Sequence, residues 1–343
     1  MIEIPEEVTR RRIYTEDCWV QLRLYRDVAT RTLADITERA CVYVTGSLAR
    51  DEAGKGSDID LFIVDQITDS PRAKLTAVEY ARLVSALDEL RANARFRPFS
   101  RGGFFLKVHS FDAMVAKIGD PDDDAQNAFT ARMLLLINSR SLINQAAYDD
   151  MRRRALDAYW LTAGPERTSI VIDAAELRFP VMLINDLLRW WGVVALNFER
   201  THRFDFFQGR LKPMEQRRVA NLKLRYARML AVYSVLMAIS ARSTEDGISR
   251  HDTEAILDMT PLERLLDLGS QRPDLARQIE SLIHQYADYL AFMSGTEDAL
   301  HAKVAEDDAW KPIKARAYTF HRDFSLLYYE IGKGKLIFDY CTI

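Results

Sequence analysis

The stretch Val42–Asp65, which reads VYVTGSLARDEAGKGSDIDLFIVD, decides the fold. Its first apolar run is short and β-branched and ends at Gly46–Ser47, and a polar loop follows. Ser57–Asp60 then opens a second apolar run. Short β-branched runs bounded by glycine and polar residues are typical of strands. The pattern therefore predicts buried strands at Val42–Thr45 and Leu61–Val64, joined by a loop.

Two carboxylates stand where the loop meets the second strand. Asp58 and Asp60 are two positions apart, so an extended chain directs both side chains to one face. Neighbouring carboxylates repel each other unless a cation lies between them, and Mg²⁺ binds through one or two carboxylates plus substrate phosphates. Gly46 would let the backbone approach a phosphate closely. The alternative is that the acids only cap or solvate a turn and that Ser47 is only an N-cap.

The composition is that of an ordinary soluble protein. The chain has 343 residues, enough for two domains, with 48% apolar and 28% charged residues. Its net charge of -3 gives no global attraction to nucleic acid or to an anionic membrane. Any such binding would need a local patch.

Cysteine usage and the termini indicate the compartment. The three cysteines form no CxxC pair, which argues against a disulfide framework or a zinc site and favours free thiols in a reducing cytoplasm. The N-terminus lacks the apolar core of a signal peptide. The longest apolar stretches, such as Met229–Ile239, are too short to span a bilayer. We therefore expect a cytoplasmic protein with no membrane partner.

The order of elements predicts two domains, at residues 1–120 and 121–343. In the first, a charged lead-in precedes predicted helices and strands that alternate. The predicted helices there are Glu16–Cys41 and Pro71–Ala94, and the further strands are Phe96–Pro98 and Phe104–Val108. The second domain is predicted to be mainly helical, with helices at Ala131–Ser139, Ala146–Trp160, Phe179–Phe198, Arg217–Ala241, Asp252–Leu268 and Asp274–Ser294. The last segment, Gly332–Ile343, would add a strand or pack on the core.

The arrangement strand, Gly46–Ser47, ten intervening residues, then Asp58–Asp60 resembles the signature of the DNA polymerase β-like nucleotidyltransferase superfamily. The resemblance covers residues 20–120. It implies an α/β (α+β) fold in which a small mixed-sheet nucleotidyltransferase domain is followed by a mainly helical domain. The helical half more loosely resembles that of bacterial nucleotidyltransferase-domain proteins, through the runs Asp123–Arg140, Leu183–Trp191 and Leu222–Leu230.

The resemblance assigns roles by position. In the superfamily the Gly-Ser pair opens a helix and contacts nucleotide phosphates, which here implies Gly46 and Ser47. The two aspartates bind the metal and act in catalysis, which implies Asp58 and Asp60. Two further loop positions, carried over as nucleotide-binding, match residues that are common but not universal: Arg50 and Ser57. Arg50 could equally be a solvated helix residue.

One expected residue is missing. Members of the superfamily usually carry a third carboxylate on a later strand, but the candidate strand Phe104–Val108 has Lys107 there. Asp112 and the cluster Asp122–Asp124 are other sources of an acid, although the cluster is more typical of a helix start. His109 is more simply structural, and Lys107 is either a surface lysine or a nucleotide contact. The missing acid leaves open a one-metal enzyme or a degenerate nucleotide-binding protein.

The function implied is a nucleotidyltransferase that depends on Mg²⁺ or Mn²⁺. It would move a nucleoside monophosphate from a nucleoside triphosphate, with ATP the first candidate, to an unidentified acceptor. Small molecules, proteins, nucleotides and tRNA all remain open as acceptors, and the helical half would select among them. The alternative is a catalytically lapsed nucleotide-binding regulatory protein. The sequence does not indicate the oligomeric state.

Several other features have simpler explanations. The basic run Arg210–Arg228 is either a phosphate or RNA surface or, slightly preferred, a solvated helix face. Arg132 and Arg140 are expected to flank a core-facing segment of one helix. The aromatic pairs Trp190–Trp191 and Tyr328–Tyr329 are expected in the core.

Overall fold

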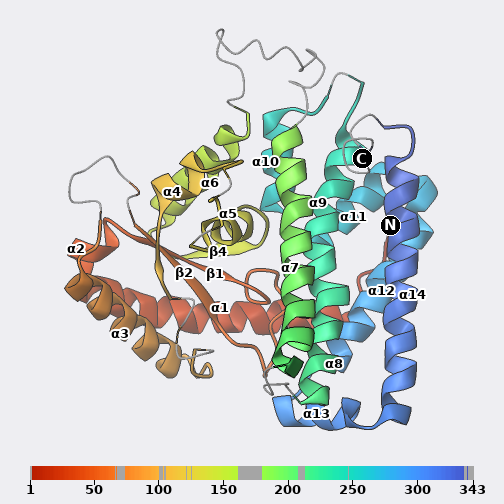
Figure 1. Cartoon of the computed structure of the whole chain (residues 1–343), viewed down its shortest axis with the longest axis horizontal. Helices are drawn as coiled ribbons and strands as arrows, with labels where there is room; N and C mark the ends of the chain where they lie inside the picture. The colour runs from red at the N-terminus through yellow and green to blue at the C-terminus, as the bar shows by residue number, and fades with distance from the viewer. Residues whose placement is uncertain are drawn as a thin grey trace. The chain divides into compact units, whose positions relative to one another are not determined.

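The computed structural model describes residues 2–65, 67, 74–99, 103, 106–120, 122–124, 126–160, 180–207, 213–245, 247–335 and 338. The chain divides into two compact units (Figure 1). One is Arg10–Gly164, and the other combines Met1–Thr9 with Pro165–Ile343. Each unit is described by itself below.

The first unit is built on a small mixed sheet, as predicted. The strand order is β3-β2-β1-β4, with β1 antiparallel to both of its neighbours and β2 parallel to β3. The elements that contribute to this unit are α1 (Glu6–Thr32), α2 (Ala34–Thr37), β1 (Cys41–Thr45), β2 (Asp60–Asp65), α3 (Ala77–Asn93), β3 (Val108–Ser110), α4 (Phe111–Ala116), α5 (Ala128–Ile137), β4 (Ser139–Ile143) and α6 (Gln145–Ala158).

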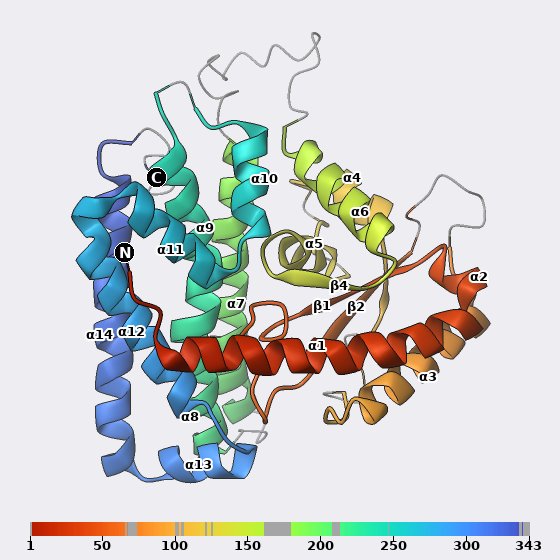
Figure 2. The same cartoon turned by 180° about the vertical axis from the view of Figure 1, so that it is seen from behind.

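Helices cover both faces of the sheet, which makes three layers (Figure 2). On one face α1 and α3 pack over an aliphatic core that includes Val42, Val44, Leu61 and Ile63. On the other face the Tyr43 hydroxyl donates to the carbonyl of Ala131 on α5. Alternate strand residues point to opposite faces, so each strand supplies both cores.

The predicted strands Val42–Thr45 and Leu61–Val64 are confirmed, with each observed strand slightly longer than the prediction. The predicted strand Phe96–Pro98 is wrong: this stretch has no regular structure. It follows Arg95, whose φ of +62° ends α3, and Pro98 has no N–H to give to a ladder. The strand predicted at Phe104–Val108 begins only at Val108, and its first two residues lie outside the described part of the chain.

The helix predicted at Glu16–Cys41 begins earlier and ends earlier. Its first turn starts at Glu6, inside the segment that the sequence suggested was a lead-in. It ends at Thr32, and α2 precedes the first strand. Within it, Cys18 is a free thiol, as is Cys41 at the start of β1.

The strand β4 was not predicted from the sequence. Residues Ser139–Ile143 pair with β1 along its free edge, so this stretch joins the sheet. Arg140 therefore lies on a strand, and the expectation that it shares a helix with Arg132 is wrong. The compact unit extends to Gly164, beyond the domain boundary at residue 120 that the sequence suggested.

The second unit is helical, as predicted. Its buried core includes Tyr226, Leu265, Ile283 and Phe324. In both views α7, α9 and α14 run along one another (Figures 1 and 2). The elements are α7 (Val181–Phe207), α8 (Met214–Lys223), the π-helical turn η3 (Leu224–Arg228), α9 (Met229–Arg242), α10 (Arg250–Asp258), α11 (Pro261–Gln271), the 3₁₀ turn η4 (Pro273–Leu275), α12 (Ala276–Phe292), α13 (Glu297–Ala305) and α14 (Asp307–Gly332).

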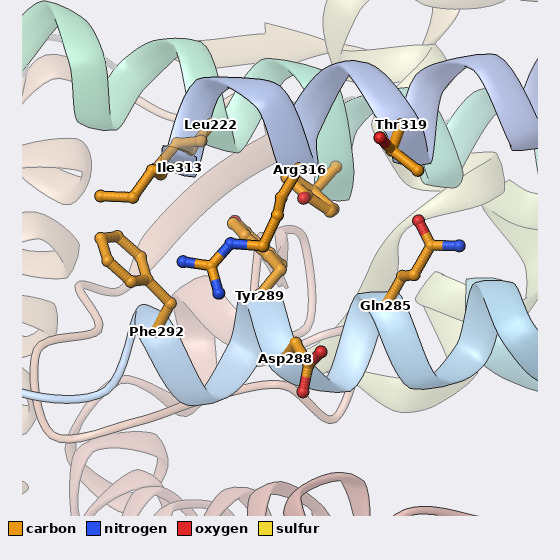
Figure 3. Close-up of a pocket in the computed structure, with 9 residues that line it drawn as sticks. Leu222, Gln285, Asp288, Tyr289, Phe292, Ile313, Arg316 and Thr319 are labelled. Carbon is orange, nitrogen blue, oxygen red and sulfur yellow. The ribbon is translucent and has the colours of Figure 1, made fainter. Parts of the chain in front are cut away.

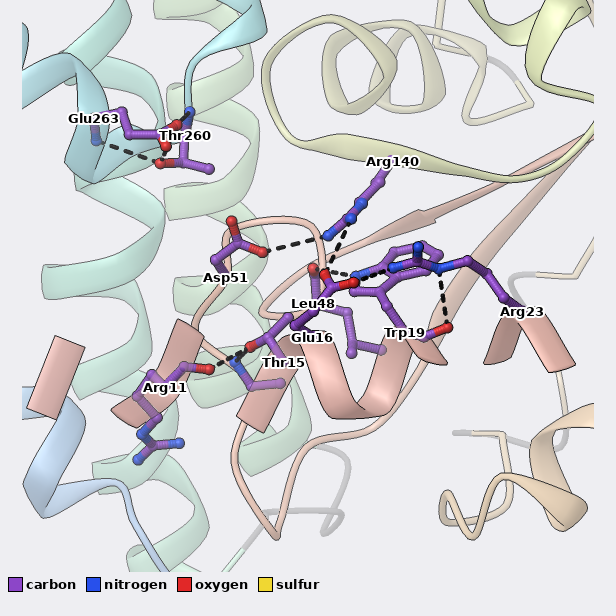
Figure 4. A network of polar contacts seen from close by, with 11 residues as sticks. Arg11, Thr15, Glu16, Trp19, Arg23, Leu48, Asp51, Arg140, Thr260 and Glu263 are labelled. Atoms are coloured by element: carbon purple, nitrogen blue, oxygen red, sulfur yellow. Dashed lines mark hydrogen bonds and ion pairs between the residues drawn. The ribbon is translucent and has the colours of Figure 1, made fainter. Parts of the chain in front are cut away.

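The helix predicted at Asp252–Leu268 is two helices. Thr260 caps α11 in a reciprocal capping box with Glu263, and Pro261 occupies the first turn (Figure 4). Fully buried Arg264 donates to the carbonyls of Ile256 and Leu257, which closes the end of α10. The break is therefore fixed by a cap on one side and by a buried guanidinium on the other.

The aromatic pairs are only partly in the core. Trp190 is buried, and Tyr328 contacts the rings of Tyr233 and Phe338. Tyr329 is 54% exposed, so the expectation of a core position is wrong for that residue. Of the final segment, Phe338 packs beside Gly332, where an added Cβ would meet its ring at 2.0 Å.

Among the residues that the structure describes, two helical stretches have the length and apolarity that a membrane span needs, namely Val181–Thr201 and Met214–Arg242. The second is 78% buried in its apolar window and the first 28%. The high burial of Met214–Arg242 is typical of a helix in the core of a protein. The absence of a membrane partner stays a prediction.

Candidate active site

Gly46 forms the turn that brings the end of β1 against the start of β2. Its φ is +77°, a conformation that glycine adopts without strain. Thr45 pairs directly with Asp60 across the antiparallel ladder. A Cβ added at Gly46 would lie 3.3 Å from Oδ2 of Asp60. The missing side chain thus leaves the backbone of this turn close to a predicted metal ligand.

Serine hydroxyl groups close the loop that follows. Oγ of Ser47 lies 3.0 Å from Oγ of Ser57, and the amide of Gly54 donates to Ser57 at 3.0 Å. The amide of Ser57 donates back to the carbonyl of Gly54 at 2.8 Å. Ser57 therefore joins the two ends of the loop, and two of the predicted site residues contact each other directly.

The helix expected directly after the Gly-Ser pair is wrong. Gly46–Asp51 forms consecutive turns, and Asp51 has a φ of +59°, which an α-helix does not contain. The amide of Glu52 donates to the carbonyl of Ser47 across these turns. Any anion site here would use amides of a turn and not the N-terminus of a helix.

One face of α1 holds this loop (Figure 4). Nε1 of Trp19 donates to the carbonyl of Leu48 at 3.1 Å, and the amide of Ala53 donates to Oγ1 of Thr15 at 2.9 Å. Arg11, one turn before Thr15, packs so closely on Gly54 that an added Cβ would lie 1.9 Å from its guanidinium. These residues recur at a spacing of four, so they share one face of the helix.

Arg50 is not the solvated helix residue that was one of its two expected roles. It lies in the turns, its side chain is 12% exposed, and its Nε lies 2.6 Å from Oε2 of Glu52. Glu52 is itself only 6% exposed. Both side chains of this ion pair are largely shielded from solvent, so their Coulomb attraction is screened less than that of a surface pair. Its role as a nucleotide ligand stays a prediction.

Asp58 and Asp60 flank a core residue. Ile59 between them is 3% exposed and belongs to the aliphatic core under α1 and α3. Both aspartates are half-buried. In an extended segment, successive side chains point to opposite sides, so Asp58 and Asp60 lie on the side opposite to Ile59.

A third acid does not join them in the described part of the chain, where no group of three or more His, Cys, Asp or Glu side chains could hold a metal. The Asp112 side chain is 65% exposed and 3.9 Å from Nη2 of Arg154. In the cluster Asp122–Asp124, fully buried Asp123 accepts two hydrogen bonds from Arg132, at 2.8 and 2.7 Å. That pair explains Arg132 and Asp123 as structural residues.

His109 lies on β3, the strand next to β2, and Lys107 immediately precedes that strand. His109 pairs with Val64 and its ring lies 5.5 Å from that of Phe62, so it shares the face that carries Asp60. The ladder begins at the pair Ile63 and Val108, so Lys107 lies one residue before it, and its side chain is exposed. Burial, and secondarily the charge of Lys107, lower the pKa of His109 to about 4. His109 is thus a buried neutral side chain, as expected of a structural histidine.

Comparison with known families supports this geometry. The model of the nucleotidyltransferase domain matches residues 28–99, which contain β1, the loop, β2 and α3. This part of the chain is similar to nucleotidyltransferase domains. The match is consistent with the DNA polymerase β-like superfamily and supports nucleotidyl transfer as the general chemistry. No curated protein and no solved structure matches the chain.

A further arginine lies beside the loop of the nucleotidyltransferase domain. Arg140 on β4 stacks 4.5 Å above the Trp19 ring and lies 3.4 Å from Glu16 and 3.5 Å from Asp51 (Figure 4). It therefore links the edge of the sheet to α1 and to the turns. This role of Arg140 was not predicted, because the sequence pattern favoured a helix at this position.

The basic run Arg210–Arg228 is not one solvated face. Arg218 is buried, donates to the carbonyls of Val304 and Ala305, and pairs with Asp307. The guanidinium of Arg225 lies 4.3 Å from the Tyr318 ring. The first residues of the run, 210–212, lie outside the described part of the chain. At least one basic residue of this run, Arg218, therefore stabilises the packing of the helical unit.

Sequence reasoning missed the residues that hold the loop of the nucleotidyltransferase domain: Arg11, Thr15, Trp19 and Glu52. Their polar atoms contact backbone groups 29 to 41 positions away, or neighbours two or four positions along the chain. The spacing of Arg11, Thr15 and Trp19 at i, i+4 and i+8 was a detectable signal for a shared helix face. Nothing in the sequence indicated which face of the sheet that helix would cover.

Proposed function

We propose that this protein is a Mg²⁺-dependent nucleotidyltransferase that moves a nucleoside monophosphate from a nucleoside triphosphate, ATP first, to an acceptor. The observation that carries the proposal is the close approach of the Gly46 turn to Asp60, inside a region that is similar to nucleotidyltransferase domains. A backbone turn beside a carboxylate suits a metal-bound triphosphate, because amides bind phosphate oxygens and the carboxylate binds the cation.

The donor set fits Mg²⁺. Asp58 and Asp60 offer two carboxylates, and the described residues add no third ligand. Mg²⁺ keeps several waters and is held by one or two carboxylates plus substrate phosphates, so two protein ligands suffice. The metal would neutralise the charge that develops on the phosphates. Mn²⁺, which also takes oxygen ligands, should substitute.

The protein's own part in the reaction is positioning. The amides of the Gly46–Asp51 turns and the hydroxyls of Ser47 and Ser57 would bind phosphate oxygens. The acceptor's hydroxyl or amine attacks the α-phosphorus, the bond to the bridging oxygen breaks, and pyrophosphate leaves. The acceptor proton passes to solvent or to a carboxylate. Arg50 is held by Glu52, and that pairing would keep its guanidinium in one orientation when a nucleotide binds.

A second function, nucleotide binding without turnover, is favoured by one observation. Lys107 lies one residue before β3, on the segment where the third carboxylate is expected, and the described residues contain no group of three or more acidic, His or Cys side chains that could hold a metal. A lysine there would supply a fixed positive charge to a bound phosphate. Such a protein would bind a nucleoside triphosphate without reacting with it, and its regulatory action would depend on whether the nucleotide is bound.

Label transfer separates the two functions. The protein is incubated with α-labelled ATP, GTP, CTP or UTP, with Mg²⁺ or Mn²⁺ and a cell extract, and label transfer and pyrophosphate are measured. Direct binding of each nucleotide is measured in parallel. Asp58→Ala with Asp60→Ala is the test variant, and Asp88→Asn, on the exposed side of α3, is the matched control.

If the protein is an active nucleotidyltransferase, the wild type transfers the label and releases pyrophosphate. The double variant then loses both activities, and the control variant keeps both. Binding without transfer in the wild type favours the regulatory function. Equal transfer by wild type and double variant would exclude the metal site. No binding of any nucleotide would exclude both functions. Loss of transfer in Asp112→Asn would reveal a third acid that the exposed position of Asp112 does not suggest.

A further inference from the structure

The helical unit contains a cavity that the nucleotidyl-transfer proposal does not use. Its volume is about 450 Å³, in the range of small-molecule sites (Figure 3). It lies between α12 and α14, with the region of α8 and η3 behind them. Its lining residues are Leu222, Tyr226, Gln285, Asp288, Tyr289, Phe292, Ile313, Arg316 and Thr319.

The wall formed by Tyr226 is rigid and comes from an irregular turn. Tyr226 lies in the π-helical turn Leu224–Arg228, a feature that is frequent at functional sites. Its ring stacks on Tyr289 with centroids 4.4 Å apart and planes at 5°, and on Phe320 at 4.4 Å. Three packed aromatic rings therefore fix the position of its hydroxyl group.

Two opposite charges line the cavity from opposite helices. Arg316 comes from α14 and Asp288 from α12, and Figure 3 shows the Arg316 side chain extending from α14 toward α12. Neither forms an ion pair within the part of the chain that the structure describes. Both act on the same hydroxyl: burial raises the pKa of Tyr226 to about 12, Arg316 lowers it and Asp288 raises it. Both charged residues are exposed to solvent. The cation and the anion thus lie near one buried phenol without forming an ion pair with each other.

The two ends of the cavity differ. Phe292 and Ile313 point toward one another at one end, beside Leu222 (Figure 3). Gln285 and Thr319 lie at the other end, and Gln285 donates to Asp323 at 3.1 Å, which holds its amide in place. The cavity therefore combines an apolar end, a fixed amide and one charge of each sign.

We propose that this cavity binds a zwitterion with an apolar side chain, in the simplest case a free α-amino acid such as phenylalanine or leucine. The ligand carboxylate would pair with Arg316, whose planar fork matches a carboxylate. The ligand ammonium group would pair with Asp288. The side chain would occupy the apolar end formed by Leu222, Phe292 and Ile313.

The charge pattern selects this class over simpler ligands. A carboxylic acid without an amine would satisfy Arg316 but bring its charge toward Asp288. An amine without a carboxylate would do the reverse. Only a ligand that carries both charges satisfies both residues, and only one with an apolar side chain gains from removing apolar surface from water. Binding at this site needs no nucleotide, so it stands apart from the proposed transfer reaction.

The test is calorimetric titration of the full-length protein with L-phenylalanine, in the absence of nucleotide and metal. Three comparison ligands each lack one feature: phenylpropionate lacks the amine, phenethylamine lacks the carboxylate, and glycine lacks the side chain. We expect phenylalanine to bind, and each comparison ligand to bind about tenfold more weakly or worse, because one paired charge or the apolar contact is lost.

Variants locate the site. Arg316→Gln and Asp288→Asn should each weaken phenylalanine binding about tenfold, the cost of one charge-assisted hydrogen bond. Matched controls on the exposed surface of α14 are Lys311→Gln and Asp308→Asn, whose side chains are 75% and 94% exposed. These should bind as the wild type does.

Three results would overturn the proposal. One is the absence of heat with phenylalanine and leucine at millimolar concentration. Another is phenylpropionate or phenethylamine binding as tightly as phenylalanine, which would remove the zwitterion class. The third is unchanged affinity in Arg316→Gln and Asp288→Asn, which would move the binding elsewhere.

Discussion

The two faces of β2 differ in what they bury. On one face Leu61 and Ile63 are almost completely enclosed by the aliphatic core under α1 and α3. On the other face the strand begins with half-buried Asp60 and continues with Phe62, which stacks on Tyr43 with centroids 5.3 Å apart. One strand thus holds the unit together with one set of side chains and offers a carboxylate with the other.

This difference shows how stability and chemistry can be separated within six residues. The aliphatic face gains free energy from burial and needs no partner groups. The other face becomes more polar toward the start of the strand, from a stacked aromatic pair to an acid beside the Gly46 turn. Substitutions on the first face should change stability, and substitutions at the start of the second should change activity.

The largest effect is expected at Asp60. Asp60→Asn should lower nucleotidyl transfer about a thousandfold, because a neutral amide binds Mg²⁺ and balances its charge poorly. The free energy of unfolding should change by less than about 1 kcal/mol, since the side chain is only half-buried. Pyrophosphate release and urea denaturation measure the two quantities. Asp65→Asn is the matched control: it is the same change at the other end of the strand, on the aliphatic face, and it should leave activity per folded molecule intact.

Leu61→Ala should show the reverse pattern. Deleting a leucine side chain that is 1% exposed should cost about 3 kcal/mol of unfolding free energy. Activity per folded molecule should remain near that of the wild type, because Leu61 points away from Asp60. A loss of specific activity as steep as that of Asp60→Asn would mean that the two faces are not separable.

His109 should make the stability of the sheet depend on pH. Its pKa is about 4 in the folded state and about 6.5 when exposed, so the unfolded state binds more protons between these values. Its stabilisation is complete above pH 6.5 and is lost as the pH falls toward 4. The free energy of unfolding should therefore fall by about 2 kcal/mol between pH 6.5 and pH 5.

Denaturation of His109→Asn at both pH values checks this expectation, since the variant should lack most of that difference. His321→Asn is the control, because burial also lowers the pKa of His321, but in the helical unit. If both variants lose the same part of the pH dependence, His109 is not its main source.

The smallest effect is expected where α1 holds the loop. Thr15→Val removes the acceptor for the amide of Ala53 and should cost about 1 kcal/mol. Transfer should fall only a few-fold, because Trp19 still holds the loop through Leu48. Thr30→Val, at the far end of α1, is the control and should change neither quantity. No change in Thr15→Val would show that the loop keeps its position without this contact.

Much of the sheet was predictable from local pattern. The two central strands and the loop between them carry glycine and β-branched residues in an order that few other structures tolerate. β4 was not predictable, because SRSLI directly follows an apolar helix and lacks a glycine or proline that would mark the boundary. The helix break at Pro261 was visible as a Thr-Pro pair with a glutamate at the third helical position, which is the pattern of a capping box.

The candidate site was predictable to the extent that it is local. Gly46, Ser47, Ser57, Asp58 and Asp60 lie within one loop and its strand ends, and the structure brings Gly46 against Asp60 and Ser47 against Ser57. The pairing of Arg50 with Glu52 was not predictable, because two neighbouring opposite charges are usually solvated. The contacts from α1 depend on which helix face covers the sheet, and that is set by tertiary packing.

The late strand β4 determines how short a working piece of this chain can be. A fragment cut at residue 120 would leave the N–H and C=O groups of β1 unpaired along a buried apolar strand, since their partners come from Ser139–Ile143. Open edges of that kind recruit other strands, and the fragment would tend to aggregate. A fragment that ends after α6, past Ala158, keeps the sheet closed on that side. The catalytic motif occupies a short stretch of sequence, but its sheet is completed by residues that come about eighty positions later.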